Sequence, residues 1–183
     1  MSDITTLRFQ KVNKPKIEDV LPHYLEGKML ESALNFIAYL CAKKMNPVWS
    51  THNRWKYAYK GKMLLNIELG KLNQYHKKTK WQIHPYLKHI DVYEDLIFNE
   101  GLQDFVWNNL MYCGNVFTGK CNSHGCAPGM NRTILGREIT KICRAHASTG
   151  RNIMCAFDPD EATIECIKKL LEFEKNARKS DLV

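Results

Sequence analysis

The fold class is decided by residues 54–62, RWKYAYKGK. Aromatic side chains alternate there with basic or small ones, and this period of two is typical of a strand with one buried face. The aromatic residues of the stretch are Trp55, Tyr57 and Tyr59. Lys60-Gly61-Lys62 indicates a turn, and the alternation then continues with apolar side chains. These are Leu65, Ile67 and Leu69. The pattern predicts an antiparallel hairpin with one face in the core and the other in contact with water.

Other segments carry helix or strand signals. Residues 28–44 place apolar side chains at helical spacing, including Leu34, and Asn46-Pro47 ends that helix. Residues 92–112 predict a second helix, which Gly101 divides. Further strands are expected at residues 80–84, 133–139 and 152–157.

The last helix has a start signal at residues 158–161, DPDE. Asp158 is the expected N-cap, Pro159 occupies the first helical position, and Glu161 is the capping-box acid. An apolar stripe follows at helical spacing and predicts that this helix packs on a core. Its members are Ala162, Ile164, Ile167, Leu170 and Leu171.

Helices before, within and after a mainly antiparallel sheet predict an α+β fold, with about five strands and about three or four helices. No internal repeat or long linker divides the chain, so residues 1–183 are expected to form a single domain. Residues 1–16 are predicted to be a basic N-terminal arm. Residues 113–131 are predicted to be a loop rich in cysteine and glycine.

The chain resembles small bacterial α+β proteins, domains of unknown function, in three stretches. These are WKYAYKGK at 55–62, WQIHP at 81–85, and DPDE at 158–161 leading into CIKKLL at 166–171. Some proteins of this kind also carry a cysteine-bearing loop before their last strands. The resemblance covers most of the chain from Lys28 onward. It implies a fold and a cytosolic location, and it implies no activity.

The formal net charge of +8 and the pI of about 9.1 are compatible with nucleic acid, acidic proteins or anionic ligands as partners. The first residues lack the order of a secretory signal, and no apolar stretch is long enough to span a bilayer. A cytoplasmic location without a membrane partner is therefore expected. The oligomeric state is left open.

Four of the seven cysteines gather late in the chain and predict a metal site. The candidate ligands are Cys113, Cys121, Cys126, Cys143 and His124. Thiolates and imidazoles are ligands that zinc prefers, and a glycine-rich loop can bring them to one centre as a structural site. The spacing C-x₂-C is absent, so two alternatives stay open. The thiols are passive, or one of them is the activated thiolate of a redox or transferase enzyme.

Aromatic residues from neighbouring segments predict a second site, in which a small molecule or acidic partner binds against the sheet. The candidate residues are Trp49, Trp55, Tyr57 and Trp81, with His84 as a polar group. The alternative for the same residues is that their rings fill the core.

Basic residues of the hairpin and of the loop after it predict a rival nucleic-acid site, because cations of this kind contact phosphates. The candidates are Arg54, Lys56, Lys60, Lys62 and Lys78. The alternative is a solvated outer face of the sheet. No catalytic constellation stands out, so a binding protein is the main hypothesis. A nucleic-acid-binding protein and a cysteine-dependent enzyme are the alternatives.

Overall fold

The computed structural model describes residues 3–72, 77–112, 130–142 and 154–180. The helices in this part are α1 (Leu7–Asn13), α2 (Ile17–Val20), η1 (Leu21–His23), α3 (Gly27–Ala42), η2 (Ile90–Val92), α4 (Glu94–Asn99), α5 (Gln103–Asn108) and α8 (Glu161–Ser180). The strands are β1 (Pro47–Thr51), β2 (Arg54–Tyr59), β3 (Lys62–Leu69), β4 (Trp81–Pro85), β5 (Met130–Ile134), β6 (Arg137–Ile142) and β7 (Ala156–Phe157). Across the described residues, no helix has both the length and the apolar character needed to cross a bilayer.

The central sheet has five antiparallel strands in the order β1-β2-β3-β4-β7. The predicted hairpin forms its middle, where Tyr59 pairs with Lys62 across the two residues Lys60 and Gly61. Both turn residues have positive φ angles, 48° and 75°, as a type I′ turn requires, and the twist of that turn matches the strands it joins. A small second sheet consists of β5 and β6. The predicted α+β class and the antiparallel sheet are thus confirmed.

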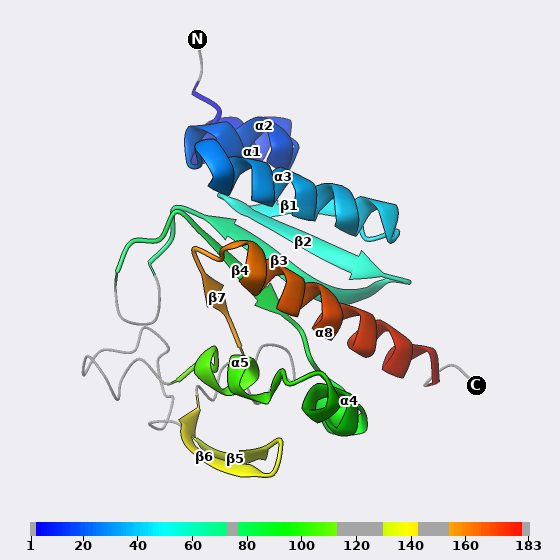
Figure 1. Ribbon diagram of the computed structural model, residues 1–183. Coiled ribbons are helices and arrows are strands. Elements are labelled where there is room, and N and C mark those ends of the chain that lie inside the picture. The colour runs from blue at the N-terminus through cyan, green and yellow to red at the C-terminus, as the bar shows by residue number, and fades with distance from the viewer. Residues whose placement is uncertain (1–2, 73–76, 113–129, 143–153, 181–183) are drawn as a thin grey trace.

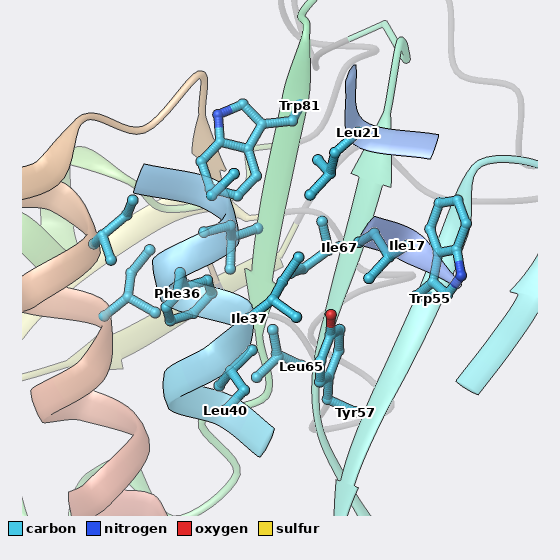
Figure 2. Packing of buried hydrophobic residues seen from close by; sticks show 14 of the residues in the cluster. Ile17, Leu21, Phe36, Ile37, Leu40, Trp55, Tyr57, Leu65, Ile67 and Trp81 are labelled. Atoms are coloured by element: carbon cyan, nitrogen blue, oxygen red, sulfur yellow. The ribbon is translucent and has the colours of Figure 1, made fainter. Parts of the chain in front are cut away.

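One face of the central sheet is apolar and is covered by α3 and α8, which cross it side by side in Figure 1. Figure 2 shows Phe36, Ile37 and Leu40 of α3 directed toward Leu65 and Ile67 of β3. From α8, the same cluster contains Ile164, Ile167 and Leu171. The helix predicted at 28–44 is confirmed, but its inward face differs in one position. Phe36 is fully buried, whereas Leu34 is 36% exposed.

A second apolar cluster lies where α4, α5 and the β5–β6 hairpin meet α8. The predicted division of the helix at Gly101 is confirmed, since this residue has a φ angle of 65° between α4 and α5. The single strand predicted at 133–139 is wrong. Leu135 and Gly136 have φ angles of 51° and 69° and form a turn, so the segment is a hairpin in which Ile134 pairs with Arg137.

The cap predicted for the last helix is wrong by two residues. The N-cap carboxylate belongs to Asp160, whose Oδ1 accepts a hydrogen bond from the backbone N–H of Thr163 at 2.8 Å. Asp158 has a left-handed φ angle of 44°, and its Oδ1 accepts from the backbone N–H groups of Lys80 and Trp81 at 2.7 and 3.0 Å. Asp158 therefore ties the connection between β7 and α8 to the start of β4.

The predicted N-terminal arm contains α1, which is anchored by the fully buried side chain of Gln10. Its Nε2 donates to Asn53 Oδ1 at 2.7 Å, and its Oε1 accepts from the Asn53 backbone N–H at 2.8 Å. The same oxygen accepts from Trp49 Nε1 at 3.3 Å. These bonds fix α1 to the turn between β1 and β2.

A buried carboxylate fastens α8 to the rest of the molecule. Glu174 is 0% exposed and accepts hydrogen bonds from His89 Nδ1 (2.9 Å), the His89 backbone N–H (3.0 Å), Tyr93 Oη (2.9 Å) and Arg178 Nε (2.6 Å). Arg178 also donates to the carbonyl groups of Met63 and Tyr86. Burial opposes ionisation of Glu174, but the hydrogen bonds from Arg178 and His89 outweigh it, so its pKa lies below the ordinary value. This network joins α8 to β3 and to the segment after β4.

We predict that Glu174→Gln lowers the free energy of unfolding by about 3 kcal/mol, because it leaves the buried Arg178 guanidinium without its counter-ion. Glu172→Gln on the same helix is the matched control. The Glu172 side chain is 31% exposed, so its ion pairs with Lys43 and Lys175 contribute about 1 kcal/mol or less. Urea unfolding measures both values. Equal losses in the two variants would contradict the role given to Glu174.

The depressed pKa of Glu174 also predicts a pH dependence. The ordinary pKa is 4.5, so above that value the carboxylate is ionised in the folded and the unfolded chain and its contribution to stability is complete. As the pH falls through the lower folded pKa, the unfolded chain takes up the proton first and the contribution is lost. The difference in unfolding free energy between the native protein and Glu174→Gln should therefore shrink as the pH falls below 4.5. A difference that grows in acid would contradict this sign.

Candidate functional site

The face of the central sheet opposite the apolar core carries a set of polar side chains, called here the polar face. The ladder places them in two cross-strand rows, since facing residues of an antiparallel pair project to the same side. Arg54 pairs with Glu68, which pairs with Gln82. Lys56 pairs with Asn66, which pairs with His84, and Cys155 lies beside His84 just before β7. The polar face consists of Arg54, Lys56, Asn66, Glu68, Gln82, His84 and Cys155.

Burial increases along the polar face from β2 toward β7. The side chain of Arg54 is 39% exposed, whereas those of Glu68 and His84 are 9% and 8% exposed. Cys155 is 0% exposed. The sequence prediction that this face is in contact with water is therefore wrong for its inner part. A buried polar group costs free energy unless it is hydrogen-bonded, so the partner of each group decides what the face can do.

In the row of Arg54, Glu68 and Gln82, the two charged side chains form an ion pair. Arg54 Nη2 lies 2.6 Å from Glu68 Oε1, and the carboxylate is almost fully buried. The same Oε1 lies 3.7 Å from His84 Nε2. Glu68 thus holds the Arg54 guanidinium above β3 and places a negative charge near the imidazole.

A chain of hydrogen bonds fixes the orientation of His84. The carbonyl of Lys71 can only accept, so the Thr79 hydroxyl donates to it at 2.9 Å. Thr79 Oγ1 in turn accepts from Gln82 Nε2 at 2.7 Å, which turns the Gln82 Oε1 toward His84. Gln82 Oε1 lies 3.2 Å from His84 Nε2. An amide oxygen has no proton to give, so His84 Nε2 carries the proton and donates it.

The same reasoning defines the state of Cys155. Its Sγ lies 3.5 Å from His84 Nε2, which is a donor and therefore not a base for the thiol. Burial raises the pKa of the Cys155 thiol well above its ordinary value, and the negative charge of Glu68 acts in the same direction. A reactive cysteine needs a lowered pKa and a neighbouring base or positive charge. Cys155 and His84 are therefore as close as a catalytic thiol and its base, but the imidazole nitrogen that faces the sulfur already carries a proton and cannot accept one.

Asn66 and Arg54 of the polar face each have one buried atom with no hydrogen-bond partner among the described residues. Asn66, 5% exposed, donates from Nδ2 to Tyr86 Oη at 2.8 Å, but nothing reaches its Oδ1. Arg54 uses Nη2 on Glu68, while its Nε–H is unmatched. An unmatched buried polar atom costs about 1–3 kcal/mol. Within the described part of the chain, Asn66 therefore has an unused acceptor and Arg54 an unused donor.

Three of the aromatic residues predicted to bind a ligand lie in the core instead of on a surface. Trp55, Tyr57 and Trp81 are 0–1% exposed and belong to the cluster shown in Figure 2. Trp49 is half-buried at the edge of the same cluster. This placement agrees with the alternative given for these residues, in which their rings fill the core. His84, named with them, lies on the opposite side of the sheet.

The basic residues predicted to contact nucleic acid are not gathered on one face. Arg54 and Lys56 belong to the polar face, and Arg54 is engaged by Glu68. Lys60 lies in the turn, with its Nζ 5.8 Å from the centre of the Tyr59 ring. Lys62 is exposed at the start of β3, and Lys78 is exposed in the segment between β3 and β4. The five positions do not form a continuous row along one strand.

The predicted zinc ligands Cys113, Cys121, His124, Cys126 and Cys143 lie outside the described residues, so the zinc site stays a prediction. Among the residues that are described, no group of three or more His, Cys, Asp or Glu side chains is arranged to hold a metal ion. Cys41 and Cys166 are half-buried on α3 and α8.

Two surface hollows are less suitable as sites. One, of about 320 Å³, lies between the starts of α3 and α8 and is rich in carboxylates, but those of Asp158 and Asp160 already accept backbone N–H groups. The other, of about 280 Å³, lies between α3 and α8. Its lysines Lys168 and Lys169 are each paired with a glutamate at 2.6 Å. Neither hollow offers an unmatched buried group in the described part of the chain.

The residues that sequence reasoning missed are Glu68, Gln82 and Cys155. The signal that locates the first two was present, since they occupy the alternate positions of strands whose other positions are apolar. That signal predicts a side of the sheet but not its burial. The contact of Cys155 with His84 depends on the pairing of β4 with β7.

Comparison with known proteins gives no further guide to this face. No family model matches the chain, and no curated protein or solved structure is significantly similar to it. The resemblance to small bacterial α+β proteins stays a prediction.

We predict that Cys155 reacts with iodoacetamide more slowly than Cys41 and Cys166 in the folded protein near neutral pH. Burial and the charge of Glu68 keep its thiol protonated, whereas the other two thiols are half-buried. Mass spectrometry of peptides after timed alkylation measures the three rates, and unfolded protein provides the control in which the rates converge. Cys155 as the fastest of the three would contradict the proton arrangement and would favour the cysteine-dependent enzyme.

Proposed function

We propose that this chain binds a small polar molecule on the polar face of its central sheet. The observation that carries the proposal is the pair of buried, unmatched atoms Asn66 Oδ1 and Arg54 Nε. A bound molecule with a complementary donor and acceptor would remove the cost of leaving them unmatched.

The contrast between the two faces of the sheet supports this proposal. The face toward α3 and α8 is apolar and close-packed, and a sheet selected for stability alone would have a similar second face where that face is buried. Instead the inner part of the polar face holds Asn66, Glu68, Gln82 and His84, each less than 10% exposed. Departures from locally favourable choices of this kind tend to mark functional sites.

The burial of these groups favours a small ligand over a macromolecule. A nucleic acid or protein surface needs an exposed patch, whereas only the Arg54 and Lys56 end of the polar face is partly open to solvent. That end would be the entrance, with Asn66 and His84 further in. The main hypothesis from the sequence, a small molecule bound at the sheet, is thus retained, but with polar residues of the opposite face in place of the aromatic residues.

The two alternative functions have weaker support. A cysteine-dependent enzyme would need a base for Cys155, and the hydrogen bonds through Thr79 and Gln82 make the nearest imidazole nitrogen a donor. A nucleic-acid-binding protein would need a row of available cations, and Arg54 is paired with Glu68. Neither alternative uses the unmatched Asn66 Oδ1.

Ligand-observed NMR with a library of small polar compounds tests the proposal. Compounds that bind the native protein should bind Asn66→Leu about tenfold more weakly or not at all, because one buried hydrogen bond is lost. Asn13→Leu is the matched control, since Asn13 is exposed on α1 and its amide contacts only its own helix. It should bind as the native protein does.

Circular dichroism establishes that both variants are folded. A library in which no compound distinguishes Asn66→Leu from Asn13→Leu would overturn the proposed function.

A further inference from the structure

We infer that the molecule bound at the polar face carries a neutral amide-type group, in which a carbonyl oxygen and an N–H lie side by side. Carboxamides, lactams, ureas and the edges of nucleobases belong to this class. The inference rests on the proposed function and names the chemical class of its ligand.

The two unmatched atoms of Asn66 and Arg54 require different partners. Asn66 Oδ1 is an acceptor and requires a donor from the ligand. Arg54 Nε–H is a donor and requires an acceptor. A carboxylate offers only acceptors and an ammonium group only donors, so each would leave one of the two atoms unmatched. An amide-type group offers both.

The two residues also lie close together in the ladder. The Arg54 guanidinium is held by Glu68, which lies directly opposite it on β3. Asn66 lies two residues before Glu68 on the same side of that strand, so the backbone positions of Asn66 and Glu68 are about 7 Å apart. A compact group, with its oxygen and nitrogen attached to one carbon atom, suits partners at neighbouring positions of this kind.

The charges of the polar face also favour a neutral ligand. Arg54 and Glu68 compensate each other, and Lys56 lies at the more open end of the face. The other titratable groups of the face are His84, which donates from Nε2, and the protonated thiol of Cys155. A positive ligand charge placed in this buried region would find Glu68 already paired with Arg54, and unpaired buried charges are costly. A neutral group avoids that cost.

Uracil, acetamide, acetate and ethylammonium form a test series. Titrations followed by NMR of the Asn66 side-chain amide and the Arg54 Nε–H should show shifts with uracil and acetamide. Acetate and ethylammonium should bind about tenfold more weakly, since each leaves one buried atom unmatched. Stronger binding of acetate than of acetamide would overturn the inference.

Arg54→Lys is the informative variant, because it keeps a cation for Glu68 and removes the Nε–H. It should lose about tenfold in affinity for uracil, as should Asn66→Leu, whereas Arg8→Lys on the exposed side of α1 should lose none. Equal affinities of Arg54→Lys and Arg8→Lys would overturn the inference, and the native-like spectrum of each variant establishes its folding.

The two proposals fail in different ways. Library compounds that bind in an Asn66-dependent manner but carry no amide-type group would overturn the ligand class and leave the proposed function standing. A library without any Asn66-dependent binder, together with uracil that shifts neither Asn66 nor Arg54, would overturn both.

Discussion

The alternation of side chains along β2, β3 and β4 is the constraint on which the rest of this molecule depends. Every aromatic or aliphatic residue directed toward α3 and α8 has a neighbour directed to the opposite side of the sheet. Trp55 and Ile67 are paired in the ladder on the core side, and Lys56 and Asn66 are paired on the other. Because a shift of register by one residue would exchange the faces, the apolar core fixes the position of every polar group described above.

Buried or partly buried polar contacts hold α8, one of the two helices on the apolar face, at both of its ends. Asp158 fixes the connection before α8 to the start of β4, and Glu174 with Arg178 fixes its last turns to β3 and to the segment after β4. Neither contact involves the polar face. The stability of the fold and the hydrogen-bond pattern of the polar face are thus carried by different residues, so that variants of one can be studied without loss of the other.

The sequence predicts the elements of this fold better than it predicts the surroundings of their residues. The hairpin around Gly61 and the helix ending before Pro47 carry strong local patterns, and both are present. The N-cap of α8 was predicted at Asp158, but the carboxylate of this residue accepts from the backbone at the start of β4, and Asp160 caps the helix instead. The turn at Gly136 was missed although the alternation breaks on both sides of it, at the adjacent apolar residues Ile134 and Leu135 and at the adjacent charged residues that follow the glycine.

The candidate site was predictable only in part, for a physical reason. His84 was recognised as a polar group near the sheet, but the strand pattern does not tell whether an alternate position is wet or buried. Its contact with Cys155 joins residues 71 positions apart, and such a contact requires the order of the strands. The loop expected to bind zinc is not among the described residues, and nothing in the fold bears on it.

We propose that the hydrogen bonds leading from Lys71 through Thr79 and Gln82 make His84 a donor, so that the polar face is suited to binding and not to thiol catalysis. The ¹⁵N NMR signals of the His84 imidazole, recorded at a pH where the ring is neutral, test it most directly. We expect a proton on Nε2 and none on Nδ1. A proton on Nδ1 with a bare Nε2 facing Cys155 would contradict it.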